Sequence, residues 1–424
     1  MATDVDVQYF SHLNGLTLGN NWGDLIRLLD KALVTGIDFT SITAASIDAQ
    51  GDVHITLYAA HNAMLFQVVE LSGFTPTSLN QKYRIKGVPS ATQLILKPKT
   101  AITETSITTV GAGKLASLGY DIIFRDTNDV KRVYRAKNPT TQHPFIRVDE
   151  SLTSPDGITG VYTSSYAKYA MVGLLEHMEH IDDYENPDVL QLPFNPADPA
   201  KNWKITGSGT GVVRGWSRWY WAHNNNFASG NHTDSATPTA SPDFALIGDK
   251  DAFYIAHGVN SANVKILYGC GFYDAGVKSS LVPNWFLMTS LKDVAAGASF
   301  STTNSIGYAP LMLDANRAAF FVPKVDELNP LSAHATASPI LPDYRGGEIE
   351  VYAGADVAAL NIPFSSTPYL LGSLKHVQYA YRRLSNYNSA EVLLSGTSIY
   401  LATALLAVTN ANKGGVYFYL GELE

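Results

Sequence analysis

Apolar side chains recur at helical spacing near the front of the chain. The recurring positions are Trp22, Leu25, Ile26, Leu29 and Leu33. Steps of three and four residues place such side chains on one face of an α-helix. Asn20 and Asn21 precede the stretch with side chains suited to an N-cap, and Gly36 follows it as a helix stop. The pattern predicts one amphipathic helix over residues 22–34.

After this stretch the apolar positions alternate instead. Between Asp52 and Tyr58, every second residue is apolar: Val53, Ile55 and Leu57. Such a period of two is typical of a half-buried β-strand. Further short apolar runs follow at residues 66–71, 82–89 and 94–96. Short strands at about ten-residue spacing indicate a small antiparallel sandwich or barrel, which we place at residues 37–110.

The remainder of the chain also reads as strands and long turns. Gly111 to Gly113 is a candidate linker between two parts of the chain. Strand-like runs then recur up to residues 415–420. A stretch rich in proline, aspartate and asparagine at residues 186–202 predicts a long surface loop. We therefore expect a mainly β fold with three parts. These are an N-terminal segment and helix (1–36), the small module (37–110) and a β-rich body (111–424) that would divide near 186–202.

Composition excludes several classes of protein. The 424 residues are 46% hydrophobic, which is enough for a large core and argues against disorder. Lysine and arginine total 30 and aspartate and glutamate 38, so the net charge of −8 argues against nucleic-acid binding through phosphates. The single cysteine, Cys270, excludes a disulfide framework and predicts a small buried strand residue.

No membrane partner is expected. The longest apolar stretch, residues 399–408, is short of the about 20 residues that a spanning helix needs. The first residues also lack the basic and apolar regions of a secretory signal. The sequence predicts a protein made in a cytoplasm.

Four segments near the front form an ordered series. They are Asp24–Gly36 (DLIRLLDKALVTG), Val53–His61 (VHITLYAAH), Val69–Asn80 (VELSGFTPTSLN) and Tyr83–Leu96 (YRIKGVPSATQLIL). The first resembles the opening helix of a family of virion proteins from tailed bacteriophages and prophages. The other three resemble the "GH…isGatp.aLNGtytVtsV" β-module that recurs among phage tail and baseplate proteins.

A second series continues the resemblance to about residue 350. Its segments are Gly119–Asn128 (GYDIIFRDTN), Val133–Arg135 (VYR), Phe145–Asp149 (FIRVD), Glu176–Asp182 (EHMEHID) and Ala245–Tyr254 (ALIGDKDAFY). They are similar to the "RVDD…YEtM…vGDsrxFY" region of the same family. The chain departs from it at Glu150, where the family has a second aspartate. The family's "RGxLPGL" segment survives only in part, at residues 344–348.

The resemblance implies a non-enzymatic structural component of the particle. It would assemble in multiple copies in the tail or baseplate, with copies of itself and other virion proteins as partners and without a cofactor. A head or collar decoration remains an alternative. Another is a receptor- or glycan-binding attachment, also conceivable as glycan-degrading, in which Trp219, Trp221 and acids such as Asp182 would act on sugars.

Aromatic and apolar residues supply the candidate interface. Trp216, Trp219 and Trp221 lie beside two arginines, a composition that favours core or subunit interface over a sugar-stacking site. The first ten residues hold Val5, Val7 and Phe10 but cannot form a core, so we expect order only against a neighbour. Trp22 on the predicted helix completes the set of candidate interface residues.

Motifs for catalysis or metal binding are weak. His177 and His180 would share a helix face, but the zincin spacing is absent, so we expect a polar surface and no metal. Gly111 to Lys114 lacks the phosphate-loop glycine, because residue 108 is a threonine. Gly207 to Gly211 lacks the dinucleotide spacing. We expect no catalytic residue and no cofactor site.

Overall fold

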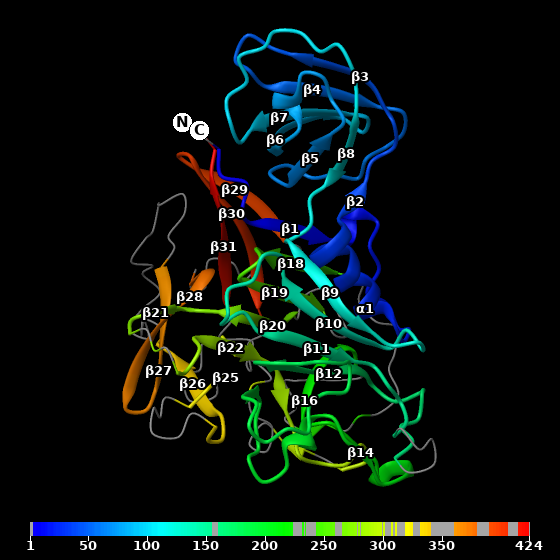
Figure 1. The fold of residues 1–424 in the computed structure, drawn as a ribbon, viewed down its shortest axis with the longest axis vertical. Coiled ribbons are helices and arrows are strands. Elements are labelled where there is room, and N and C mark those ends of the chain that lie inside the picture. The colour runs from blue at the N-terminus through cyan, green and yellow to red at the C-terminus, as the bar shows by residue number, and fades with distance from the viewer. Residues whose placement is uncertain are drawn as a thin grey trace.

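The computed structural model shows a mainly β protein, as the sequence predicts (Figure 1). It describes residues 3–154, 160–223, 231–232, 234, 243–258, 265–277, 279, 281–298, 300–301, 307, 310–311, 319–324, 331–340, 360–379, 390–405 and 414–423. The motif at residues 344–348 lies outside the described residues. In the described part of the chain, no helix is both long and apolar enough to cross a membrane.

The N-terminal part of the chain forms one sheet, the upper lobe of Figure 1. Within the fully described residues 3–154 this sheet has seven strands, in the order β2-β8-β5-β6-β7-β4-β3. Along the chain they are β2 (Ile37–Asp38), β3 (Ile42–Ile47), β4 (Val53–Leu57), β5 (Val68–Ser72), β6 (Lys82–Ser90), β7 (Gln93–Pro98) and β8 (Ala112–Leu115). On β4 the alternating residues are buried, because one face of the sheet covers the core.

A central sheet follows in the chain. In the described residues its order is β23-β16-β12-β11-β10-β9, with β13 also paired to β12. Its strands are β9 (Tyr120–Arg125), β10 (Lys131–Ala136), β11 (Phe145–Asp149), β12 (Lys168–Leu175), β13 (Gln191–Leu192), β16 (Ser217–Ala222) and β23 (Ser290–Leu291).

The largest sheet runs from the N-terminal segment to the end of the chain. Its described strands follow the order β1-β18-β19-β20-β22-β25-β26-β27-β28-β31-β30-β29, and β21 adds to β28. They are β1 (Gln8–Ser11), β18 (Phe244–Gly248), β19 (Ala252–Gly258), β20 (Lys265–Phe272), β21 (Asp274–Ala275), β22 (Trp285–Met288), β25 (Phe320–Val322), β26 (Ala335–Pro339), β27 (Leu360–Ser366), β28 (Tyr369–Tyr379), β29 (Glu391–Ser395), β30 (Ser398–Leu405) and β31 (Gly414–Glu422).

The middle of this largest sheet is buried on both faces. On β19, Phe253 packs into the core shared with the central sheet, where its ring lies 6.0 Å from that of Trp219. The next residue, Tyr254, faces the opposite core, where its ring lies 5.7 Å from that of Phe418 on β31. Successive side chains of a strand point to opposite faces, and every residue of β19 is buried. The body therefore has three layers.

Short elements complete the description. Two small ladders pair β14 (Ile205–Thr206) with β15 (Val213–Arg214) and β17 (Asn231–His232) with β24 (Phe300–Ser301). Single 3₁₀ turns lie at His12–Asn14, Thr77–Leu79, Pro199–Asn202 and Gly209–Gly211.

The helix expected at residues 22–34 is divided in the structure. An α-helix, α1, covers Asp24–Leu29, and a π-helical segment continues over Asp30–Thr35. Gly36 ends this segment with a φ of +72°. A Cβ atom at Gly36 would lie 2.1 Å from the Leu115 carbonyl oxygen, so the chain can pass β8 only with glycine here.

The N-terminal segment is ordered against its own chain, which corrects our expectation that it needs a neighbour. Its strand β1 pairs antiparallel with β18, Gln8 opposite Gly248. The Gln8 side chain donates to the carbonyl oxygens of Val68 and Ala116, both at 2.8 Å, and accepts from Val68 N. The segment thus joins the upper lobe to the body, and long-range pairing supplies the core that ten residues lack.

The stretch at residues 186–202 is also more structured than the surface loop we expected. Leu190, Leu192 and Phe194 within it are buried. Leu192 lies on β13, opposite Leu174 of β12. The polar residues form turns at the surface, while these apolar side chains fix the stretch to the central sheet.

Candidate functional site

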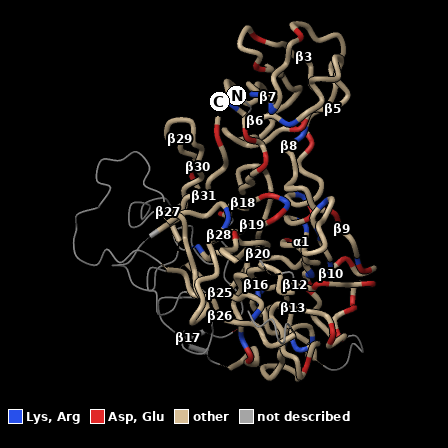
Figure 2. Tube along the Cα trace, turned by 60° about the vertical axis from the view of Figure 1, so that its left-hand side comes forward, with Lys and Arg blue, Asp and Glu red and all other residues tan. Residues whose placement is uncertain are grey.

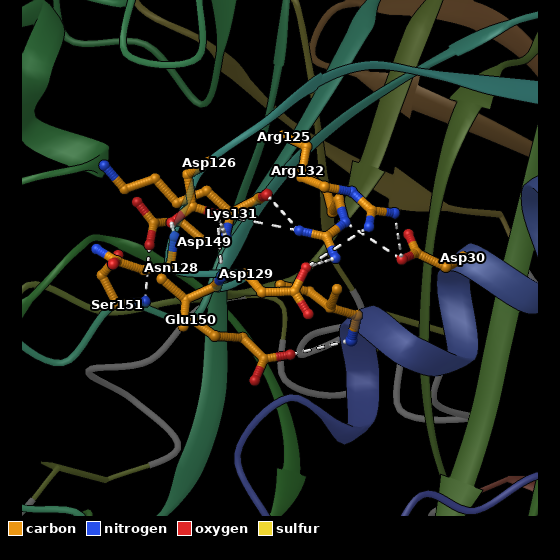
Figure 3. A network of polar contacts seen from close by, with 12 residues as sticks. Asp30, Arg125, Asp126, Asn128, Asp129, Lys131, Arg132, Asp149, Glu150 and Ser151 are labelled. Atoms are coloured by element: carbon orange, nitrogen blue, oxygen red, sulfur yellow. Dashed lines mark hydrogen bonds and ion pairs between the residues drawn. The ribbon is translucent and has the colours of Figure 1, made fainter.

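Charged residues from segments far apart in the sequence meet in one polar network, hereafter the framework network. Figure 3 shows the part of it around Asp30, Arg132 and Glu150. Its members come from the end of α1, the β9–β10 hairpin, β11 and the segment after β12. Figure 2 shows charged residues of both signs along this region, where α1 lies near β9 and β10. The network therefore gathers segments that are far apart in the sequence.

Arg147 on β11 is the buried centre of one half of the framework network. Its Nη2 donates to Asp182 Oδ1 at 2.7 Å, and its Nε donates to the Ile181 carbonyl oxygen at 2.8 Å. Its Nη1 lies 2.9 Å from Asp149 Oδ2, an ion pair without hydrogen-bond alignment. Lys131 Nζ also donates to Asp182 Oδ1, at 2.7 Å. Two cations and two carboxylates thus balance one another.

Aromatic rings cover the Arg147 guanidinium. Its central carbon lies 4.8 Å from the ring centre of Tyr184 and 4.5 Å from that of Trp203, within cation–π range. Burial alone would raise the pKa of Asp149 and Asp182. The neighbouring cations outweigh burial and hold the pKa of both carboxyl groups below the usual value. Both acids are therefore ionised ion-pair partners at neutral pH.

The other half of the framework network fixes the helical segment to β10. Arg132 Nε donates to Asp30 Oδ2 at 3.2 Å, and Arg132 Nη2 donates to Asp129 in the hairpin turn. The Tyr134 hydroxyl donates to the other oxygen of Asp30 at 2.7 Å. Since Arg132 and Tyr134 are both buried, these contacts hold the start of the π-helical segment in one position.

Glu150, at the end of β11, caps α1. Its carboxylate accepts from Gly23 N and from Ile26 N, the latter at 3.0 Å. The helix has no side-chain cap of its own, because Gly23 is its N-cap residue. Burial raises the pKa of Glu150 to about 7, although the two backbone N–H groups favour the charged form.

The structure places five of the seven candidate interface residues in the interior. Val5, Val7 and Phe10 are at most 4% exposed, and Trp219 and Trp221 are each 1% exposed. Trp219 stacks on Tyr268 of the facing sheet at a ring distance of 5.8 Å. These side chains therefore belong to the core. The rings of Trp219 and Trp221 are not accessible to a sugar or a partner.

Trp22 and Trp216 are half-buried and also contact their own chain. The Trp22 ring meets that of Trp221 edge-on at 5.7 Å, and its Nε1 donates to the Ser164 carbonyl oxygen at 3.1 Å. Trp216 packs edge-on against His334 at 5.0 Å. Both side chains remain partly exposed.

The histidine and cysteine candidates show no site chemistry. His177 and His180 lie in a segment that is neither helix nor strand, and the His177 side chain is 60% exposed. No group of three histidine, cysteine or acidic side chains in the described residues is placed to hold a metal ion. Cys270 is buried in β20, as the sequence predicts, and burial raises the pKa of its thiol.

A pocket of about 390 Å³ lies where the β27–β28 hairpin meets the chain between β20 and β22. Phe272, Tyr273 and Leu371 line it and are almost fully buried, whereas Tyr369 and Leu370 at the hairpin tip are 56% and 65% exposed. Sequence reasoning missed this pocket. Its residues are ordinary members of separate strand patterns, and only the pairing of β21 with β28 brings them together.

Comparison with known proteins adds little. No protein-family model matches the chain, and no curated protein sequence matches it. Among solved structures, a phage phi92 endosialidase matches at 10% sequence identity with a TM-score of 0.13. The match covers 92% of this chain but 51% of the other, so the chain spans about half the length of that structure. At this TM-score nothing about the present chain follows from the match.

Proposed function

We propose that the chain is a structural component of a tailed-bacteriophage virion, made in the host cytoplasm and assembled in multiple copies in the tail or baseplate. The observation that supports this most directly is the framework network. The motif residues that resemble the virion family hold the fold in place. Arg147, Asp149 and Asp182 each contact a partner inside the chain, as scaffold residues do.

The glycan-degrading alternative is less well supported. Asp182 is paired with Lys131 and Arg147, and its pKa is lowered. A general acid in glycoside cleavage needs a raised pKa instead, so that it is protonated before it acts. Trp219 and Trp221 are buried and cannot stack on sugar rings. A head or collar position is the other alternative, because contacts inside the chain carry no information about its position in the particle.

The proposal is tested on particles of the phage or prophage that encodes the chain. Particles are purified by two successive density gradients, and the chain is quantified against the major head protein by mass spectrometry. We expect a fixed copy number of the chain per particle, a small integer or a small multiple as in a ring or attachment. In electron micrographs, antibody label should lie at the tail. Label on the head would support the decoration alternative. Absence from particles, with the chain abundant in the lysate, would overturn the proposal.

A further inference from the structure

Strand β28 contains an insertion where it pairs with β27. On β27, Asn361 and Pro363 are two positions apart, while their partners on β28, Gln378 and Ser373, are five positions apart. The three additional residues form a β-bulge, a feature that points side chains away from the regular ladder. We call residues 374–377 the β28 bulge.

Two side chains of the β28 bulge reach the turn between β18 and β19. His376 Nε2 lies 3.0 Å from Asp249 Oδ2, and Lys375 Nζ donates to Asp251 Oδ2 at 3.2 Å. The Tyr254 hydroxyl donates to the Lys375 carbonyl oxygen at 2.9 Å. The backbone of His376 has a φ of +61°, a conformation that residues other than glycine rarely adopt. These contacts therefore hold a strained segment in place.

A second histidine contacts the same turn from the central sheet. His143, just before β11, has its Nε2 2.9 Å from Asp251 Oδ1. Its Nδ1 accepts from the backbone N–H of Thr140 at 2.9 Å, so this nitrogen carries no proton and Nε2–H donates to Asp251. A proton on Nδ1 would set two donors against each other. The geometry therefore fixes His143 in one neutral tautomer.

His376 is free to change its charge. Its Nδ1 has no protein partner in the part of the chain that the structure describes, and its side chain is 16% exposed, so water can add or remove a proton there. A histidine ordinarily titrates near pH 6.5. Burial would raise the pKa of Asp249, but the hydrogen bond and the charge of His376 hold it below its usual value. Asp249 therefore stays ionised while His376 titrates.

The other charged groups around His376 keep their charge between about pH 5 and about pH 8, because carboxylates and lysines do not ordinarily titrate there. They are Lys375 beside it, Lys250 and Asp251 in the turn, and Asp274 on β21. Tyr419 on β31 lines the same pocket as His376, and burial raises the pKa of its hydroxyl, which stays neutral. His376 is thus the group whose charge changes.

We propose that His376 is a proton-operated latch that holds the β28 bulge on the β18–β19 turn. When His376 takes up a proton, its imidazolium forms an ion pair with Asp249 and tightens the contact. When the proton leaves, a neutral hydrogen bond remains, and the bulge opens more often. The extra stability is present below the ordinary histidine transition and is lost as the pH rises through it. The latch concerns the fold alone, so it stands or falls independently of the proposed function.

Hydrogen exchange of the purified full chain, followed by mass spectrometry, tests the latch. Protection of peptides covering residues 370–379 is measured at about pH 5.5 and about pH 8, on either side of the histidine transition, and corrected for the intrinsic pH dependence of exchange. We expect about threefold to fivefold more protection at the lower pH, as for a partly exposed ion pair. Slow exchange of the His376 ring C2 proton reports its protonation in the same peptides, and protection should follow that titration.

Two substitutions remove the latch in different ways. His376→Gln keeps an N–H donor but cannot take up a proton. Asp249→Asn loses the charge but keeps the Oδ1 acceptor, which holds the turn through the N–H groups of Asp251 and Ala252. Each variant should show equal protection at the two pH values. His54→Gln is the matched control, because it breaks a similar pair with Asp48 in the upper lobe and should keep the wild-type difference.

The wild-type chain alone can overturn the inference, if residues 370–379 are equally protected at the two pH values. A difference that persists in His376→Gln and Asp249→Asn also overturns it, because another group would then carry the pH dependence. Loss of the difference in His54→Gln would likewise overturn it, since that effect is not local to the bulge. Circular dichroism at both pH values establishes that each variant is folded.

Discussion

Arg84 on β6 offers the sharpest test of how the upper lobe is held to the body. It is fully buried, and its guanidinium donates to four carbonyl oxygens at 2.6–3.0 Å. These belong to Asp4, Val7, Phe66 and Leu420. One side chain therefore joins the N-terminal segment, the upper lobe and β31. Substituting methionine keeps much of the side-chain volume and removes every donor.

The size of the effect follows from two opposing terms. Each orphaned carbonyl costs about 1–3 kcal/mol, so four of them cost about 4–12 kcal/mol. Burial lowers the pKa of Arg84 from 12.5 to about 10, a shift of 12.5 − 10 = 2.5. At about 1.4 kcal/mol for each pKa unit, relief of that burial offsets about 3 kcal/mol. The lost hydrogen bonds outweigh the relief, and we expect Arg84→Met to destabilise the junction by about 4 kcal/mol.

Native-state hydrogen exchange measures this locally. Peptides covering residues 3–10 and 414–423 should exchange far faster in Arg84→Met, while the central sheet keeps most of its protection. Arg27→Met is the control, because the Arg27 side chain is 63% exposed and its ion pair with Asp24 should contribute no more than about 1 kcal/mol. Unchanged exchange in both peptides, or an effect no larger than that of Arg27→Met, would refute the reasoning.

Three further predictions concern other parts of the fold. The folded pKa of Glu150 is raised from 4.5 to about 7, so its contribution to stability is present below pH 4.5 and is lost as the pH rises to 7, by about 3 kcal/mol. Glu150→Gln should remove this part of the pH dependence of thermal unfolding. Parallel pH profiles for the variant and the wild type would contradict the assignment. Trp219→Ala should lower the free energy of unfolding by about 3–5 kcal/mol in urea titrations, against less than about 1 kcal/mol for Ile123→Ala, which is 40% exposed on the same sheet. Gly36→Ala should be poorly folded by circular dichroism. Gly51 has a similar φ of +81°, but no atom lies closer than 3.9 Å to a new Cβ there, so Gly51→Ala should lower the free energy of unfolding by only about 1–2 kcal/mol. Equal effects of the two substitutions would show that close approach to Leu115 is not the constraint.

Local patterns predicted what depends on local geometry. The alternation of Val53, Ile55 and Leu57 predicted β4, because a strand with one buried face must alternate. The helical spacing near Leu29 did not reveal the change from α to π turns, which depends on how the segment packs against β9 and β10. The mainly β class was predictable for the same reason as β4.

Long-range pairing was the part that the sequence did not reveal. Val5, Val7 and Tyr9 alternate, and this signal could have predicted a strand in the N-terminal segment. No nearby residue indicates that their partner strand is β18, which lies more than 230 positions away in the sequence. The pocket was hidden in the same way, since Gln142 and Leu370 become neighbours only through sheet topology.

The contact between the two ends of the described chain bears on how the protein is made. Asp4 N donates to the Glu422 carbonyl oxygen at 3.1 Å, and the Leu420 carbonyl oxygen accepts from Arg84. During synthesis the upper lobe leaves the ribosome early, at a time when residue 420 does not yet exist. Three of the four carbonyl acceptors of Arg84 therefore exist before β31 is synthesised, and the fourth completes the junction late. A ribosome stalled near residue 400 would carry a nascent chain in which β1 can already pair with β18, while the contact of Arg84 with β31 is still missing.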